Sequence, residues 1–262
     1  MSAPQGSHPA SMNELPFVAP CRPLAITASF GWLQKGWRDM ARAPLQSLFY
    51  GVLLTLLSMA IAVMTWRLGL IALYLGLASG FVFIGPFLAV GLYSISYQLE
   101  IDRRPTLAYS LSEGRAHLRD TLVLGICLLI VLLVWARAAT IMNVFRPESA
   151  LPTWRELIPF FGIGSAVGAV FASIAFAATA FSLPMLLDRR TDAVTGVVTS
   201  INATLRNKAA MAVWGVIIVL GVLAGFATLL LGFVVLLPLI GHATWHAYRE
   251  TIEASMWPPT HE

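Results

Sequence analysis

The sequence predicts an all-α integral membrane protein with six transmembrane helices, arranged as three hairpins that each follow an interfacial amphipathic helix. Three observations predict this fold. First, the 262 residues are 58% hydrophobic and only 11% charged, whereas soluble domains carry about 25% charged residues. Second, the chain contains apolar runs long enough to cross a bilayer. Third, its basic residues flank these runs, as they do at the ends of transmembrane helices.

The apolar runs give the predicted spans in chain order. Four of them cover residues 45–66, 68–99, 121–142 and 157–187. The fifth run, residues 209–240, is uncharged and would be about 48 Å long as one helix, against a hydrocarbon core of about 30 Å. We therefore expect it to split near Gly225 into two short spans. One strongly tilted helix is the alternative, and it would give five spans.

Amphipathic segments precede the predicted hairpins, at residues 27–42, 106–119 and 192–208. In the first, apolar and charged side chains alternate at helical spacing, with Phe30, Leu33, Trp37 and Met40 set against Lys35, Arg38, Asp39 and Arg42. Basic residues opposite aromatic ones are typical of a helix that lies in the membrane interface. The alternative is a solvated helix that packs on the protein.

The remaining segments complete the domain organisation. Residues 1–25 are rich in Pro, Ser and Ala, and this composition predicts a disordered cytoplasmic tail. Residues 26–253 form a single helical membrane domain, and residues 254–262 form a C-terminal tail. The two cysteines lie far apart, so neither a disulfide framework nor a CxxC metal site is available.

Three similar units follow one another, at about residues 27–100, 101–188 and 189–252. The amphipathic segments end in similar tripeptides, which are Trp37-Arg38-Asp39, Leu118-Arg119-Asp120 and Leu205-Arg206-Asn207. Each unit also carries a proline and a Gly-x-x-x-Gly pair, at Pro86, Pro184 and Pro238 and at Gly76/Gly80, Gly164/Gly168 and Gly221/Gly225. Such glycine pairs predict close helix packing. The prolines predict kinks or, alternatively, free carbonyl groups that line a cavity.

The basic residues predict the orientation of the chain. With six spans, both termini and all the amphipathic segments share one side, which collects 13 of the 17 Lys and Arg residues. These are Arg22, Lys35, Arg38, Arg42, Arg103, Arg104, Arg115, Arg119, Arg189, Arg190, Arg206, Lys208 and Arg249. Because positive charge favours the cytoplasmic side, both termini are predicted to be cytoplasmic.

The segment from Pro238 to Glu250 holds the densest group of functional side chains. As a helix it places His242, His246, Arg249 and Glu250 on one face. Trp245 and Tyr248 lie on the other face and, with Trp37, are predicted to anchor the protein at the interface.

The two histidines are candidate metal or haem ligands. His242 and His246 have i, i+4 spacing and could bind a transition metal or haem together with His117. In the alternative, which we favour, they hydrogen-bond to helix ends, headgroups or carboxylates, because two histidines are too few for a closed site. We therefore expect no cofactor.

Other functional patterns are missing from the sequence. No Asp, Glu or Lys lies well inside a predicted span, although ion-coupled transport usually needs such a group. The sequence contains no Walker-type loop, no HExxH and no GxSxG motif. The charges flank apolar runs instead of forming a basic patch, which argues against nucleic-acid binding. We expect a protein without catalytic activity of its own.

Three stretches resemble a bacterial family of predicted integral membrane proteins of unknown function. They are Gly241-His242-Ala243-Thr244-Trp245-His246-Ala247-Tyr248-Arg249, the run from Trp32 to Asp39, and the run from Gly85 to Tyr93. Some members of that family are labelled cytochrome c oxidase subunits, and the resemblance therefore implies a respiratory context.

Two functions are compatible with these patterns. The first is an accessory or assembly subunit of a larger membrane complex, such as a respiratory oxidase. Such a subunit would contact the lipid bilayer and either a membrane-protein partner or a second copy of itself. The second is a transporter or channel for a neutral or lipidic solute, which the proline-containing hairpins suggest. A cavity lined by Pro86, Pro184 and Pro238 would favour the second.

Overall fold

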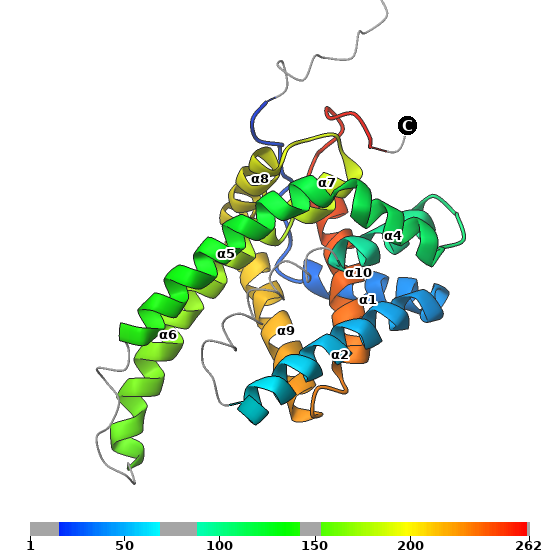
Figure 1. Cartoon of the computed structure of the whole chain (residues 1–262). Helices are drawn as coiled ribbons and strands as arrows, with labels where there is room; N and C mark the ends of the chain where they lie inside the picture. Colours follow the sequence, from blue (N-terminus) through cyan, green and yellow to red (C-terminus); the bar gives the residue numbers. More distant parts are fainter. Residues whose placement is uncertain (1–15, 69–87, 142–152, 261–262) are drawn as a thin grey trace, which may run out of the picture.

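A computed structural model describes residues 16–68, 88–141 and 153–260 of the chain, and these residues are almost entirely helical (Figure 1). Residues 88–100 form a helix that carries no label in the figures. The labelled helices are α1 (Ala28–Arg42), α2 (Pro44–Leu68), α4 (Leu107–Ala116), α5 (Leu118–Ile141), α6 (Trp154–Thr179), α7 (Ser182–Asp188), α8 (Ala193–Arg206), α9 (Lys208–Ala227) and α10 (Phe233–Thr251).

Four helical segments are long and apolar enough to cross a membrane. They are Pro44–Met64 in α2, Leu118–Ile141 in α5, Trp154–Asp188 in α6 and α7, and Lys208–Ala227 in α9. The protein is therefore an all-helical integral membrane protein in a lipid bilayer. The predicted second span falls mostly on residues 69–87, outside the described residues. α10 is not among the four segments, and its last turns carry charged residues.

The long run at residues 209–240 forms two helices and not one. α9 ends at Ala227 and α10 begins at Phe233. Between them Leu229 and Leu230 have φ angles of 52° and 71°, in the left-handed region that few non-glycine residues adopt. The expected break near Gly225 is thus present, and a single tilted helix over this run is excluded.

Helix α10 occupies the centre of the described fold, in contact with α1, α2, α7 and α9. Glycines bring the neighbouring helices close to its backbone. A Cβ atom at Gly36 of α1 would lie 2.7 Å from the Ala243 nitrogen, and one at Gly51 of α2 would lie 2.0 Å from the Val234 oxygen. Pro238 lacks the N–H that would bond to this Val234 carbonyl, four residues earlier. The α2 backbone therefore packs where the α10 hydrogen-bond ladder is interrupted.

The amphipathic helices α1 and α8 pack through one face and leave several large apolar side chains exposed. In α1 the buried residues are Ser29, Trp32, Gly36, Asp39 and Met40, whereas Phe30 and Trp37 are 60% and 55% exposed. In α8, small and hydroxyl residues are buried and large aliphatic residues at both ends are exposed. Large apolar side chains on the outer face of a membrane protein are suited to contact with lipid.

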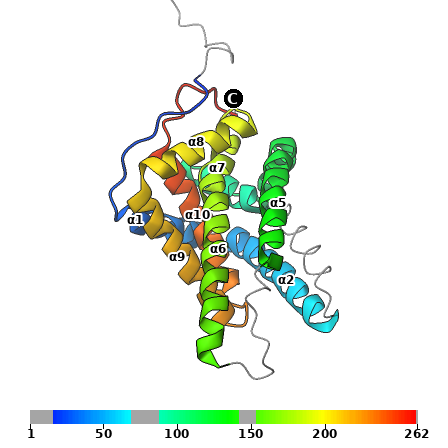
Figure 2. The ribbon, with the colours of Figure 1, turned by 90° about the vertical axis from the view of Figure 1, so that its left-hand side faces the viewer.

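Helices α5 and α6 pack on each other and on α8, and their far ends extend away from the other helices (Figure 1), toward the viewer in Figure 2. None of the 26 residues of α6 is buried, and α5 buries residues only near its start, at Thr121, Leu124 and Gly125. We refer to these two helices as the α5–α6 pair. Most of their surface would face lipid or another membrane protein.

The predicted glycine pairs differ in how they pack. A Cβ atom at Gly164 would meet no atom within 4 Å, and one at Gly168 would meet only the Trp135 Nε1, at 3.8 Å. Gly221 and Gly225 do approach α10, through Ile240 and Phe233. Close packing is therefore not found at Gly164, because the surrounding helices are too distant. Gly76 and Gly80 lie outside the described residues.

The predicted prolines occupy different structural positions. Pro86 lies outside the described residues. Pro184 is in the first turn of α7, where a proline needs no helical hydrogen-bond partner. Between α6 and α7 the helical hydrogen bonds are interrupted, and Ser200 supplies partners for the backbone there. Its hydroxyl accepts from the Phe181 N–H and donates to the Ala177 carbonyl. Of these three prolines, Pro238 is the one that lies beyond the first turn of a described helix, as Pro159 also does in α6.

The described parts of both predicted tails are ordered against the helices, which corrects the expectation of a disordered tail for residues 16–25. The Ala19 N–H donates to Thr199 and the Leu24 N–H donates to Asn207. The backbones of Cys21 and Ile252 form an isolated antiparallel β-bridge. In the C-terminal segment, Trp257 is buried and the Arg190 N–H donates to the Pro258 carbonyl.

Candidate functional site

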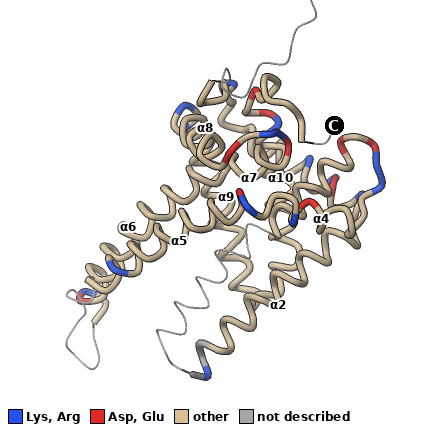
Figure 3. The backbone as a smooth tube through the Cα atoms, turned by 45° about the horizontal axis from the view of Figure 1, so that its top comes forward, with Lys and Arg blue, Asp and Glu red and all other residues tan. Residues whose placement is uncertain are grey.

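Most charged residues of the described chain gather at one end of the molecule, around α4, α7, α8 and the end of α10 (Figure 3). Basic residues at the opposite ends of α2, α5 and α6 are few, and they are Arg67, Arg137 and Arg155. The fold therefore has one strongly polar end and one predominantly apolar end, as expected for a protein that presents its charges to one side of a bilayer.

At the polar end, α10 binds carboxylates from three other segments. Its His246 Nε2 lies 2.7 Å from Asp39 of α1, and its Arg249 contacts Glu100 at 2.7 Å and Asp188 of α7 at 3.1 Å. We call these five residues the polar cluster. Two further pairs are more exposed, Lys35–Glu250 and Arg22–Glu253.

The aromatic residues of α10 belong to the same polar end. Trp245 and Tyr248 are 0% and 1% exposed, so their predicted role as interface anchors is wrong. The Trp245 indole donates to Glu100 at 2.9 Å, and the Tyr248 hydroxyl donates to Asp188 at 2.7 Å. Buried rings with paired polar atoms fix the position of α10 within the protein. Trp37, by contrast, is 55% exposed and remains available as an anchor.

His242 is completely buried and both of its ring nitrogens are hydrogen-bonded. The Nε2 lies 2.9 Å from the Ser47 hydroxyl, and the Nδ1 lies 2.8 Å from the Ser96 hydroxyl. Because the Ser47 hydroxyl donates its only proton to the Ala43 carbonyl, it accepts from Nε2–H. Ser96 then donates to Nδ1. This arrangement describes a neutral histidine that joins α2, α10 and residues 88–100.

The three predicted metal ligands do not converge. His246 is bound to Asp39 and His242 to two serines. The His117 Nδ1–H donates to the Glu113 backbone oxygen, and this nitrogen lies 3.7 Å from the Glu113 carboxylate. In the described part of the chain, no group of three or more His, Cys, Asp or Glu side chains is placed to hold a metal ion.

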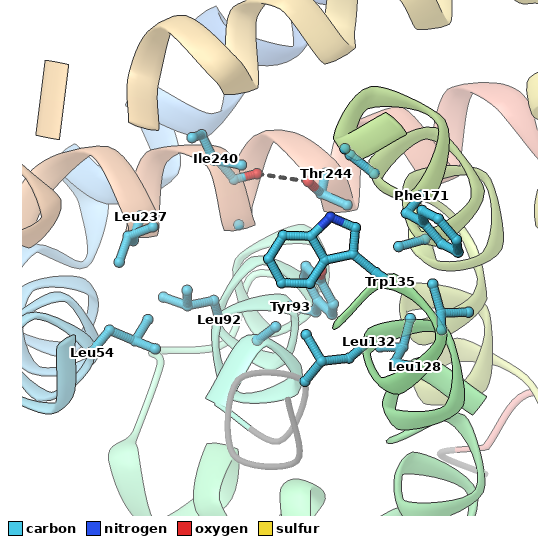
Figure 4. A pocket seen from close by; sticks show the side chains of 16 residues that line it. Leu54, Leu92, Tyr93, Leu128, Leu132, Trp135, Phe171, Leu237, Ile240 and Thr244 are labelled. Atoms are coloured by element: carbon cyan, nitrogen blue, oxygen red, sulfur yellow. Dashed lines mark hydrogen bonds between the residues drawn. The ribbon is translucent and has the colours of Figure 1, made fainter. Parts of the chain in front are cut away.

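A second feature is an apolar groove between the α5–α6 pair and the helices around α10. Its volume is about 660 Å³, within the roughly 300–1,000 Å³ of ligand pockets. The side chains around it come from α2, residues 88–100, α5, α6 and α10 (Figure 4), and they include Leu54, Tyr93, Leu132, Trp135, Phe171 and Ile240. No charged residue is among the described residues that line it, and neither Pro184 nor Pro238 is.

Comparison with known proteins agrees with the membrane assignment. A family model described as "Predicted integral membrane protein (DUF2189)" matches residues 73–188. The matched region contains the whole run from Gly85 to Tyr93 and ends at Asp188 of the polar cluster. It does not reach the run from Trp32 to Asp39 or the C-terminal run. No curated protein and no solved structure matches the chain.

The main residues missed by sequence reasoning are the partners of α10. The sequence directed attention to residues 238–250, but Asp39, Glu100 and Asp188 were not assigned to them. One signal was available, because Glu100 and Asp188 each close a predicted repeat unit at the side that carries the C-terminal charges. Ser47 and Ser96 gave no signal, since serines within apolar helices commonly bond to their own backbone.

Proposed function

We propose that this protein is a non-catalytic accessory or assembly subunit of a membrane complex in the bacterial inner membrane. The respiratory oxidase context comes only from the family resemblance of the sequence. The observation that carries the proposal is the α5–α6 pair, in which α6 buries none of its residues. A helix pair with so little contact to its own protein offers a large apolar surface to the helices of a partner.

The ion pairs support a topology with six spans and both termini in the cytoplasm. Arg249 contacts both Glu100 and Asp188, so residues 100, 188 and 249 lie on one side of the membrane. The chain between residues 188 and 249 must then cross an even number of times. Crossings by both α9 and α10 satisfy this condition, and the positive-inside rule places the polar end in the cytoplasm.

The helix boundaries support three repeated units. In each unit a short helix is followed, after one intervening residue, by a longer helix. The intervening residues are Ala43 between α1 and α2, His117 between α4 and α5, and Asn207 between α8 and α9. We propose that each unit is an interfacial helix followed by a membrane hairpin.

Co-purification tests the accessory role. The tagged full-length chain is expressed in its own host, solubilised in a mild detergent, and compared with variants of the α5–α6 pair. Exposed Ile130 and Ile174 would each be replaced by Trp, and exposed Val219 of α9 would be replaced by Trp as a matched control. We expect a stoichiometric membrane-protein partner that is lost in the α5–α6 variants only. A chain that purifies alone in each case would contradict the proposal.

A second candidate function is the binding or transfer of a neutral or lipidic solute, and the apolar groove favours it. The groove lies between helices long enough to span the bilayer, and its described lining carries no charge. Lipid transfer between vesicles by the purified protein would distinguish this function, because an accessory subunit needs no such activity.

A further inference from the structure

Two hydrogen-bond donors in the apolar groove lack acceptors. Tyr93 and Trp135 both line the groove, and neither the Tyr93 hydroxyl nor the Trp135 indole N–H donates a hydrogen bond to another residue in the described part of the chain. In Figure 4 the Trp135 indole lies across the groove, with its nitrogen on the side of Thr244. The Thr244 hydroxyl donates to the Ile240 carbonyl, at 2.8 Å. The groove therefore has an apolar wall and two N–H or O–H groups that point to no protein acceptor.

Unpaired donors are unfavourable in an apolar site. A hydroxyl or indole N–H that leaves water without gaining an acceptor loses free energy, and hydrocarbon offers no replacement. A molecule that brings an acceptor oxygen would satisfy both groups. Because no charged side chain belongs to the described lining, a charged ligand would be unpaired there, so the acceptor should belong to an uncharged group.

We propose that the groove binds an uncharged lipidic molecule with a long hydrocarbon chain and a carbonyl oxygen, such as a lipid ester. The Tyr93 hydroxyl and the Trp135 indole N–H donate to the carbonyl, and the chain lies against Leu54, Leu132 and Phe171. Gly168 leaves space beside the indole, since a Cβ atom there would be 3.8 Å from the Trp135 Nε1. This inference rests on the second candidate function for its choice of site, but it requires binding and not transfer.

The chain offers matched variants for a test. Gly168→Leu places a side chain next to Trp135, whereas a side chain at Gly164, one helical turn away on α6, meets no atom within 4 Å. Tyr93→Phe removes one donor and keeps the ring. Two probes differ only in the acceptor, the methyl ester of stearic acid and octadecane. The full-length protein, delipidated in detergent, is mixed with each probe, and bound probe is counted by native mass spectrometry.

We expect saturable binding of the methyl ester to the wild-type protein and to Gly164→Leu, and little or none to Gly168→Leu. Tyr93→Phe should bind the ester roughly 2–10-fold more weakly, as expected for the loss of one hydrogen bond, and should bind octadecane as the wild type does. Equal binding by the two glycine variants, or equal affinity of the wild type for ester and alkane, would overturn the proposal. Binding without vesicle transfer would remove the transfer function and leave this site intact.

Discussion

Replacing Gly51 by alanine tests the packing of α2 on α10. The added Cβ atom would lie 2.0 Å from the Val234 oxygen and 2.9 Å from the Pro238 Cγ. Carbon and carbonyl oxygen normally stay at least about 3.3 Å apart, so the two helices must separate locally by about 1.3 Å. Overpacking of this kind costs about 1–3 kcal/mol. The separation also leaves the Val234 carbonyl, which has no helical partner because of Pro238, facing an apolar gap.

The matched control is Gly215→Ala in α9, where a Cβ atom meets nothing within 4 Å. Both substitutions replace a glycine within an apolar helix, so the gain in helix propensity is shared and cancels in the comparison. Unfolding free energies measured by denaturant titration in one detergent should show Gly51→Ala less stable than Gly215→Ala by about 1–3 kcal/mol. Equal stabilities would refute the close approach of α2 to α10 at Pro238.

Four further predictions concern the polar end. His242→Phe should lower the unfolding free energy by about 1–3 kcal/mol in denaturant titration, because it leaves the buried Ser96 hydroxyl unpaired. His246→Gln should lower it by less than about 1 kcal/mol, because glutamine keeps a donor for Asp39. Arg249→Met should lower the same free energy by more than Lys35→Met does, since Arg249 pairs with buried Asp188 and Lys35 only with half-exposed Glu250. Burial raises the pKa of Asp192, but hydrogen bonds from Thr195 and Val194 outweigh burial and lower this pKa in the folded protein. The ionised Asp192 cap therefore stabilises the fold above the pKa of the unfolded chain, and this stabilisation is lost as the pH falls through the pKa of the folded protein. Acid should consequently reduce the unfolding free energy of the wild type more than that of Asp192→Asn. Elemental analysis of the purified protein should find less than one equivalent of copper, zinc or iron, and a full equivalent that disappears in the His242→Gln, His246→Gln variant would contradict the assigned hydrogen bonds.

Much of the fold was predictable from patterns that follow directly from the bilayer. The spans in α2, α5, α6 and α9 are long apolar runs, and only such runs can cross hydrocarbon. The break in residues 209–240 followed from length alone. The amphipathic segments were also predicted as helices, and their apolar periodicity is strong in α1 and α8 and weak in α4.

The orientation of those amphipathic helices could not be predicted by the rule used for soluble proteins. In water the larger apolar face is the one that packs on the protein, whereas Phe30 and Trp37 of α1 are exposed. In a bilayer both surroundings of the helix are partly apolar, so backbone fit decides which face packs. In α1 that face contains Gly36, whose missing side chain allows contact with the α10 backbone.

The groove and the polar cluster depend on contacts between distant segments. Trp135 lies near the end of an apolar run, which is the usual position of an interface anchor, and nothing in the neighbouring sequence indicates that it faces Gly168. Likewise, Asp39 lies inside α1, Glu100 ends the helix of residues 88–100, and Asp188 ends α7, so the three are far apart along the chain. Their common contact with α10 appears only once the helices are packed.

Topology mapping tests the account most directly, because the polar cluster requires its segments to share one side of the membrane. Reporter domains would be fused after Arg104, Ser149, Arg190 and Glu253, each to a chain that runs from residue 1 to the fusion point. We predict cytoplasmic signals from the fusions after Arg104, Arg190 and Glu253 and a periplasmic signal after Ser149. A periplasmic signal after Glu253 together with a cytoplasmic one after Arg190 would contradict the Arg249–Asp188 contact, and with it the six-span arrangement.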